Sequence, residues 1–141
     1  GTRQFGFEDQ GWVAWFIIAT LFNKPITIYG NGKQVRDMLY ADDLVDAFNR
    51  FINSDLKRGL FNIGGGPANT ISLLEFLDEL KLLTGKKPKV KFADWRPSDQ
   101  KVYITDSSKL EKALNWKIKT KVLEGIRKLT EWIKENENYF S

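Results

Sequence analysis

The sequence has no cysteine and no histidine among its 141 residues. Without cysteine the chain can form no disulfide and has no thiolate nucleophile, and without either residue it has no Cys/His zinc site. Histidine, the side chain most used for acid–base catalysis near neutral pH, is therefore not available. The sequence also has no basic segment leading into an apolar run and a small-residue cleavage site, so we expect a reducing, cytoplasmic location.

Long hydrophobic runs are scarce. The longest apolar stretch, from Trp12 to Phe22, is about half of the ~20 residues that a membrane span needs. We therefore expect no membrane partner and one globular domain over residues 1–141. The chain begins with glycine and its one methionine is Met38. We expect it to be a fragment of a longer protein.

The charge is divided unevenly along the chain. Residues 1–80 carry 7 Lys/Arg against 10 Asp/Glu, whereas residues 81–141 carry 15 against 8. A basic half suits an anionic partner, so a standalone nucleic-acid-binding module is one alternative. No recognition motif accompanies these lysines, and we expect no nucleic-acid partner.

Strand and helix signals alternate along the sequence, which predicts an α/β fold with partly parallel pairing. A capping box at Ser72 and Glu75 predicts a helix ending near Gly85. Gly30 and Gly32 suit the positive φ angles of a tight turn. The expected strands are 26–29, 34–40, 60–63, 90–92 and 102–104, and the expected helices are 12–21 (capped by Asp9), 42–52 (from Asp42 or Asp43), 72–83, 106–114 (capped by Asp106) and 120–133 (capped by Thr120).

Two short motifs imitate known sites. Gly64-Gly65-Gly66 lies between a predicted strand and a helix, as in a dinucleotide-binding turn, but Asn69 stands where the third glycine belongs. The helix also begins several residues late, so an NAD site here is only an alternative. Tyr29 and Lys33 match the Tyr-x-x-x-Lys pair of reductases, but two intervening glycines disfavour the helix that this pair needs.

Two arginines are more informative. Arg36 follows the glycine turn, and Arg96 lies in the loop 93–101 ahead of Asp99. Two guanidinium groups converging on a diphosphate, with a carboxylate left for a ribose hydroxyl, form a coherent binding site. The alternative is a pair of surface arginines neutralised by Asp37 and Asp99.

Six segments resemble, in this order, the C-terminal part of the extended short-chain dehydrogenases/reductases that act on nucleotide-diphospho-sugars. The segments are 3–6 (RQFG), 8–15 (EDQGWVAW), 28–37 (IYGNGKQVRD), 40–44 (YADDL), 61–65 (FNIGG) and 96–99 (RPSD). Segments 9–13 and 98–103 are most similar to the branch of 2-epimerases acting on CDP-linked sugars. The resemblance implies a substrate-binding subdomain of short strands with flanking helices, without the N-terminal Rossmann half.

The resemblance also implies site residues. Arg36 and Arg96 match the arginines that grip the diphosphate from two sides, while Asp99 and Tyr103 match contacts to the ribose and the phosphate end.

Thr27 and Tyr29, on one face of a strand, match positions that flank the base. Gln10, Gly11 and Trp12 match the segment that closes over the nucleotide.

In such enzymes the N-terminal half holds NAD and the catalytic Tyr-x-x-x-Lys pair. NAD takes a hydride from a sugar carbon and returns it to the other face. The resemblance therefore implies a CDP-sugar substrate, inverted at C2 in the whole enzyme, with this chain inactive by itself. A 4-epimerase or 4,6-dehydratase of the same family is the alternative.

Without the N-terminal half, the apolar surface that would pack against it is expected to be exposed. The helix from Trp12 to Phe22 and the strand Leu60–Ile63 are expected to pack against that half. When uncovered they favour association, so we predict a dimer or a domain-swapped assembly.

Overall fold

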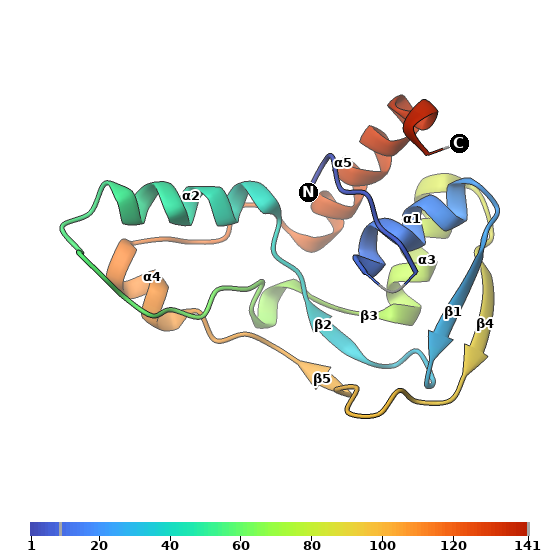
Figure 1. Ribbon diagram of the computed structural model, residues 1–141, viewed down its shortest axis with the longest axis horizontal. Coiled ribbons are helices and arrows are strands. Elements are labelled where there is room, and N and C mark those ends of the chain that lie inside the picture. The colour runs from blue at the N-terminus through green and yellow to red at the C-terminus, as the bar shows by residue number, and fades with distance from the viewer. Residues whose placement is uncertain (9, 141) are drawn as a thin grey trace.

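The fold is a mixed α/β arrangement, as predicted, in a computed structural model that describes residues 1–8 and 10–140. The expected cap Asp9 lies outside the described residues. In chain order the elements are α1 (Trp12–Leu21), β1 (Pro25–Tyr29), β2 (Val35–Asp37), α2 (Ala41–Ile52), η1 (Pro67–Asn69), β3 (Thr70–Ser72), α3 (Leu73–Thr84), β4 (Lys89–Ala93), β5 (Val102–Tyr103), α4 (Ser108–Leu114), α5 (Val122–Glu135) and η2 (Glu137–Tyr139) (Figure 1).

The strands form two small sheets. β1 and β4 run parallel, with Pro25 opposite Lys89 and Tyr29 opposite Ala93. β2 is the centre of the other sheet, antiparallel to β3 and parallel to β5. The predicted glycine turn is confirmed, with φ of 91° at Gly30 and 76° at Gly32. It leads from one sheet into the other, so the strands on its two sides do not pair.

α1, α3, α5 and the strands that pack on them form the larger part of the molecule, which we call the main lobe (Figure 1). α1 is apolar nearly all round, and it packs against both α3 and α5. Trp12 meets the fully buried Phe76 edge-on, with ring centroids 5.1 Å apart. The expectation that this helix exposes an apolar face is wrong, because α3 and α5 cover it.

Helix ends are fixed by local and by distant groups. The predicted capping box is confirmed: the Ser72 hydroxyl accepts from the Glu75 amide, and the Glu75 carboxylate accepts from the Ser72 amide at 2.8 Å. The Ser72 hydroxyl also donates to the Glu75 carboxylate at 2.6 Å, and this bond together with the one from the Ser72 amide holds the pKa of Glu75 below its ordinary value. The Asp106 carboxylate accepts from the Ser108 amide, which lowers the Asp106 pKa. The predicted Asp106 cap is nevertheless wrong, because Ser107 is the N-cap residue of α4 and makes no side-chain cap bond.

The predicted Thr120 cap on α5 is wrong. Lys121 is the N-cap residue and makes no side-chain cap bond. The buried Asn69 amide accepts from the Val122 amide at 3.2 Å and donates to the Thr120 carbonyl at 3.0 Å. A side chain about fifty residues away therefore holds the start of α5, which no local pattern could predict.

α2, α4 and the segments 53–66 and 115–118 form a second region, which we call the wing, set apart from α1, α3 and α5 in Figure 1. Its core surrounds the fully buried Trp116, whose indole donates to the Asp43 carbonyl at 2.9 Å. The buried Asp43 carboxylate accepts from the amides of Lys119 and Thr120, at 3.1 and 3.0 Å. Asp43 therefore ties α2 to the chain that enters α5.

The predicted strand Leu60–Ile63 is not formed. Its backbone is held near the start of α4 by side chains, since Lys109 donates to the Leu60 carbonyl and Ser107 accepts from the Gly64 amide. No strand in the described part of the chain pairs with it, and Leu60 is 85% exposed.

No helix within residues 1–8 and 10–140 is both long and apolar enough to cross a membrane.

Candidate nucleotide-diphosphate site

A cavity of about 350 Å³ lies where the start of α1, β1, β2 and the loop 93–101 meet. The sequence explains this placement, because the glycine turn brings β2 back beside the end of β1. The cavity is lined by Glu8, Trp12, Phe16, Thr27, Ile28, Tyr29, Gln34, Arg36, Leu73 and residues 96–99.

Arg36 projects from the central strand β2 and is held in place before any ligand arrives. Its Nη2 donates to Asp99 Oδ1 at 2.8 Å, and its Nη1 donates to the Val35 carbonyl at 2.8 Å. The side chains of this ion pair are only 20% and 25% exposed. A guanidinium group has five N–H donors, so donors remain for a phosphate oxygen.

The predicted alternative pairing of Arg36 with Asp37 is wrong. The Asp37 carboxylate accepts from the amides of Gly66 and Thr105, at 2.9 and 3.2 Å. Asp37 therefore joins three segments of backbone, and Asp99 is the carboxylate that pairs with Arg36.

Arg96 reaches the same cavity from the loop 93–101. Its guanidinium carbon lies 3.8 Å from the ring centroid of Tyr29, a cation–π contact. Trp95 covers Gly30, where an added Cβ would lie 2.5 Å from the indole. The loop is thus docked on the end of β1, and two arginines sixty residues apart line one cavity.

The other predicted residues divide into two groups. Trp12 and Thr27 line the cavity, whereas Tyr103 does not belong to the described lining and is the register partner of Arg36 on β5. Gln10 and Gly11 lie outside the lining: Gln10 closes a tight turn with Phe7, and Gly11 begins α1 with φ of 75°.

Gln34 is a lining residue that the sequence reasoning missed. Its amide nitrogen donates to the Tyr29 carbonyl at 2.7 Å, and its Oε1 is buried without a partner among the described residues. Gln34 lies two positions before Arg36 on an extended segment, and this spacing could have placed both on one face. Glu8 and Phe16 were also missed, although Glu8 begins the family-like segment 8–15.

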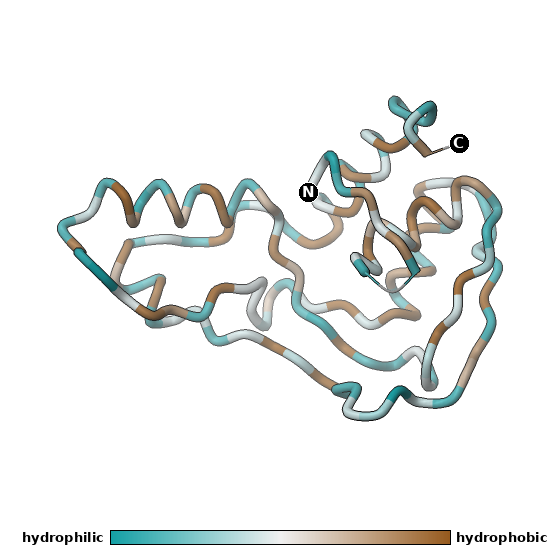
Figure 2. The backbone as a smooth tube through the Cα atoms, in the orientation of Figure 1, coloured by the Kyte–Doolittle hydropathy of each residue, from teal (hydrophilic) through white to brown (hydrophobic). Residues whose placement is uncertain are grey.

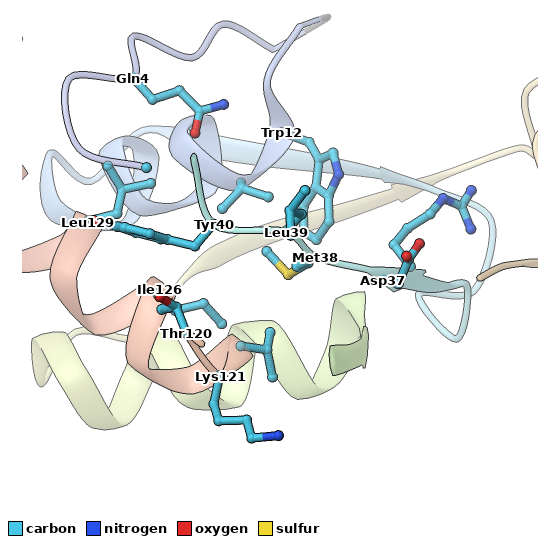
Figure 3. A pocket seen from close by; sticks show the side chains of 15 residues that line it. Gln4, Trp12, Asp37, Met38, Leu39, Tyr40, Thr120, Lys121, Ile126 and Leu129 are labelled. Carbon is cyan, nitrogen blue, oxygen red and sulfur yellow. The ribbon is translucent and has the colours of Figure 1, made fainter. Parts of the chain in front are cut away.

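A second cavity of about 290 Å³ adjoins the first and shares Trp12 and Arg36 with it. Figure 3 shows Gln4 and Trp12 on one side of this cavity and α5 residues such as Ile126 on the other, while the Lys121 ammonium points away. Arg36 therefore lines both cavities.

The glycine segment 64–66 does not form a dinucleotide-binding turn. Gly65 packs directly against the Met38 backbone, and the Gly66 amide is bonded to Asp37. α3 begins only at Leu73, after η1 and β3, so its first amides do not face these glycines. The glycine segment 64–66 therefore does not fit NAD. Tyr29 and Lys33 lie on a strand end and a turn, not on one helix.

The chain is similar to known proteins over most of its length. The GDP-mannose 4,6 dehydratase family profile matches residues 12–129, which include Arg36, Arg96 and Asp99. The chain belongs to this family. The chain is 40% identical over 139 residues to the CDP-paratose 2-epimerase of Salmonella typhi. It is 37% identical over 113 residues to the UDP-glucuronate 4-epimerase of Thermodesulfobacterium geofontis.

Solved members of this family share the fold. The UDP-glucose 4-epimerase of Thermotoga maritima, solved with UDP-glucose, has a TM-score of 0.83 and 28% identity over 97% of the chain. MoeE5, solved with UDP-glucuronic acid and NAD, has a TM-score of 0.83 and 26% identity over 89% of the chain. The resemblance to extended short-chain dehydrogenases/reductases is confirmed.

The match covers only part of these family members. The chain spans 41% of the Salmonella typhi epimerase, 34% of the Thermodesulfobacterium enzyme, 43% of the Thermotoga enzyme and 42% of MoeE5.

Proposed function

We propose that this chain is the substrate-binding part of an NAD-dependent nucleotide-diphospho-sugar epimerase. The cavity between β1, α1 and the loop 93–101 binds the nucleotide diphosphate. The observation that carries the proposal is the approach of Arg36 and Arg96 to one cavity, with Asp99 bonded to the first.

Each residue has a role in this proposal. Arg36 and Arg96 bind the diphosphate from two sides, because guanidinium groups match phosphate oxygens in charge and geometry. Asp99 accepts from the ribose hydroxyls, and Tyr103 lies at the phosphate end. Thr27 and Tyr29 flank the base.

The segment Gln10–Trp12 covers the bound nucleotide, although Gln10 and Gly11 do not line the empty cavity. Trp12 forms part of the wall.

The chain contributes binding energy to the reaction. Holding the nonreacting nucleotide diphosphate places the sugar, and such remote binding stabilises the transition state by positioning. The glycine segment 64–66 does not fit NAD, so we assign the cofactor to the remainder of the enzyme. We therefore expect this chain alone to bind nucleotide without converting a CDP-sugar. Conversion by the purified chain would contradict this expectation.

We propose a CDP-linked sugar inverted at C2 as the substrate, supported by the 40% identity to the CDP-paratose 2-epimerase. A UDP-sugar 4-epimerase is the second candidate, supported by the 37% identity to the UDP-glucuronate 4-epimerase. Titration with CDP, UDP and dTDP separates these candidates, and tighter binding of UDP than CDP would favour the second. A cytoplasmic location stays a prediction.

Arginine substitutions test the assignment directly. We expect Arg36→Ala and Arg96→Ala each to weaken CDP binding by about 1.5–3 kcal/mol, or roughly 10- to 150-fold in Kd. Calorimetric titration measures the change. Arg127→Ala is the matched control, since Arg127 pairs with Glu131 on the exposed surface of α5. An unchanged Kd in both cavity variants would remove the proposed site.

A further inference from the structure

The guanidinium group of Arg96 covers one face of the Tyr29 ring. Its central carbon lies 3.8 Å from the ring centroid, and both residues line the same cavity. Tyr29 is half-buried at the end of β1, whereas Arg96 is exposed on the loop 93–101. A planar group this close to the ring leaves no room for a second planar group on the same face.

The backbone is anchored on both sides of Arg96. On one side the Trp95 indole packs over Gly30. On the other side Asp99 accepts from Arg36, and the Asp99 amide donates to the Arg96 carbonyl at 3.2 Å. Figure 2 shows the loop as a mostly hydrophilic stretch between β4 and β5, and no residue of it belongs to the two described apolar clusters. The Arg96 side chain can therefore change partner without moving the loop or opening a core.

The proposed function gives each member of this contact another partner. Tyr29 flanks the base, and Arg96 binds the diphosphate. A base that stacks on the covered face of Tyr29 must displace the guanidinium group, because both would occupy the same layer over the ring. A charge-assisted hydrogen bond to phosphate is stronger than a cation–π contact at an exposed site, so the displaced group gains by turning to the diphosphate.

We propose that Arg96 and the nucleobase exchange places on Tyr29 when a nucleotide binds. The base takes the ring face, and the Arg96 guanidinium turns to the diphosphate beside Arg36. The proposal deepens the proposed function and rests on it. It makes Tyr29 a specificity-determining residue. A base replaces the contact that the ring loses, whereas inorganic pyrophosphate draws Arg96 away and leaves the ring uncovered. Diphosphates that carry a base are therefore favoured over those without one.

Tyr29→Leu tests the exchange because it changes the affinities for two ligands in opposite directions. The variant has no ring, so Arg96 is released before a ligand binds. We expect inorganic pyrophosphate to bind about two- to fivefold more tightly than to the parent chain, which is the range of an exposed cation–π contact. CDP should bind about fivefold or more weakly, since the lost base stacking outweighs the release of Arg96. A purely structural loss at position 29 would weaken the binding of both ligands.

Two control variants accompany this experiment. Tyr29→Phe keeps the ring and should leave both Kd values within about twofold of the parent chain. Tyr139→Leu removes an exposed tyrosine of η2, outside the described lining, and should change neither Kd. Calorimetric titration measures the Kd of CDP, and competition against CDP measures that of pyrophosphate. Unchanged or weaker pyrophosphate binding by Tyr29→Leu would overturn the exchange, and so would CDP binding that is not weakened.

Ring-current shifts in NMR spectra provide a second measurement that does not depend on affinity. The guanidinium protons of Arg96 lie over the Tyr29 ring in the free chain and should resonate upfield of those of other arginines. Arg96→Lys identifies the signal. The upfield shift should persist in Tyr29→Phe, be absent from Tyr29→Leu and disappear when CDP saturates the parent chain. A shift that persists at saturation would mean that the guanidinium group stays on the ring, and it would overturn the proposal.

The parent chain tests the proposed function separately from the exchange. If the parent chain does not bind CDP, the proposed substrate is contradicted and the exchange fails with it. If CDP binds but pyrophosphate does not compete with it, the diphosphate site itself is contradicted. If both ligands bind to one site and Tyr29→Leu does not change their affinities in opposite directions, the exchange alone is contradicted and the proposed function stands.

Discussion

The main lobe and the wing are built from similar residues but are enclosed to very different degrees. Among the described residues, the buried cluster of the main lobe has sixteen apolar members contributed by three helices and two strands. The wing cluster has four, grouped around Trp116. α1 is covered by α3 and α5, whereas α2 has a covered side and an exposed apolar side.

This difference in enclosure determines what holds each region in place. The main lobe holds the arginine cavity on elements whose packing is complete within the chain, so the cavity is positioned without a partner. The wing is held by a small core and by the hydrogen bonds of Asp43. Its stability should therefore depend more strongly on single polar contacts.

The largest expected effect lies in the main lobe. Phe76→Ala removes a fully buried ring that packs on Trp12 and Phe16, and we expect a loss of about 3–5 kcal/mol in unfolding free energy. Urea denaturation followed by tryptophan fluorescence measures it. Leu82→Ala on the same helix should change stability by less than about 0.5 kcal/mol. Equal effects of the two variants would show that the main lobe is not closely packed.

Asp43→Asn tests the polar attachment of the wing. The variant replaces one of two carboxylate oxygens that accept backbone amides, and we expect a cost of about 1–3 kcal/mol. Hydrogen exchange should accelerate at the amides of Lys119 and Thr120 and leave the core of α1 protected. Asp42→Asn, at the exposed neighbouring position, is the matched control. Faster exchange throughout α1 would mean that the two regions unfold as one unit.

Ser72→Ala removes one half of the capping box of α3, and we expect a loss of about 1 kcal/mol at neutral pH. The folded-state pKa of Glu75 is lowered, so its contribution is present above the unfolded pKa near 4.3 and is lost as pH falls through the folded pKa. The difference between the variant and the parent chain should shrink below about pH 4. A difference that stays constant down to pH 2 would contradict the role of the Glu75 carboxylate.

The smallest effect is expected on the open side of α2. Phe48→Ala should change the stability of the chain by less than about 0.5 kcal/mol, because the ring is mostly exposed. Phe51→Ala, on the side that packs against the wing core, should cost clearly more in the same denaturation experiment. A large loss for Phe48→Ala would show that α2 is covered on both sides.

Local chemistry in the sequence predicted most of the elements. The capping box at Ser72, the turn at Gly30, the continuous apolar run of α1 and the periodic apolar residues of α2 depend on neighbours within a few positions. Strand pairing does not, since β1 pairs with residues more than sixty positions away. Leu60–Ile63 has the composition and alternation of a strand, but a strand also needs a partner, and the described chain provides none.

The site was also predicted only in part, because some of its contacts depend on residues that are distant in the sequence. Arg36 and Arg96 stand out as guanidinium groups beside a turn and in a loop, and the family resemblance brings them together. Which carboxylate pairs with Arg36 depends on the fold: the turn from Arg96 to Asp99 directs Asp99 to Arg36, while Asp37 is used by the backbone. The role of Gln34 depends on the Tyr29 carbonyl and has no local signal of its own.

The bond between Arg36 and Asp99 gives the empty cavity an internal counter-ion. Under the proposed function, inorganic phosphate uses only the remaining guanidinium donors and offers the Asp99 carboxylate nothing. A nucleotide diphosphate uses the same donors and also gives Asp99 sugar hydroxyls as new donors. The pair thereby selects against the free phosphate that is abundant in cells and favours anions that carry a ribose.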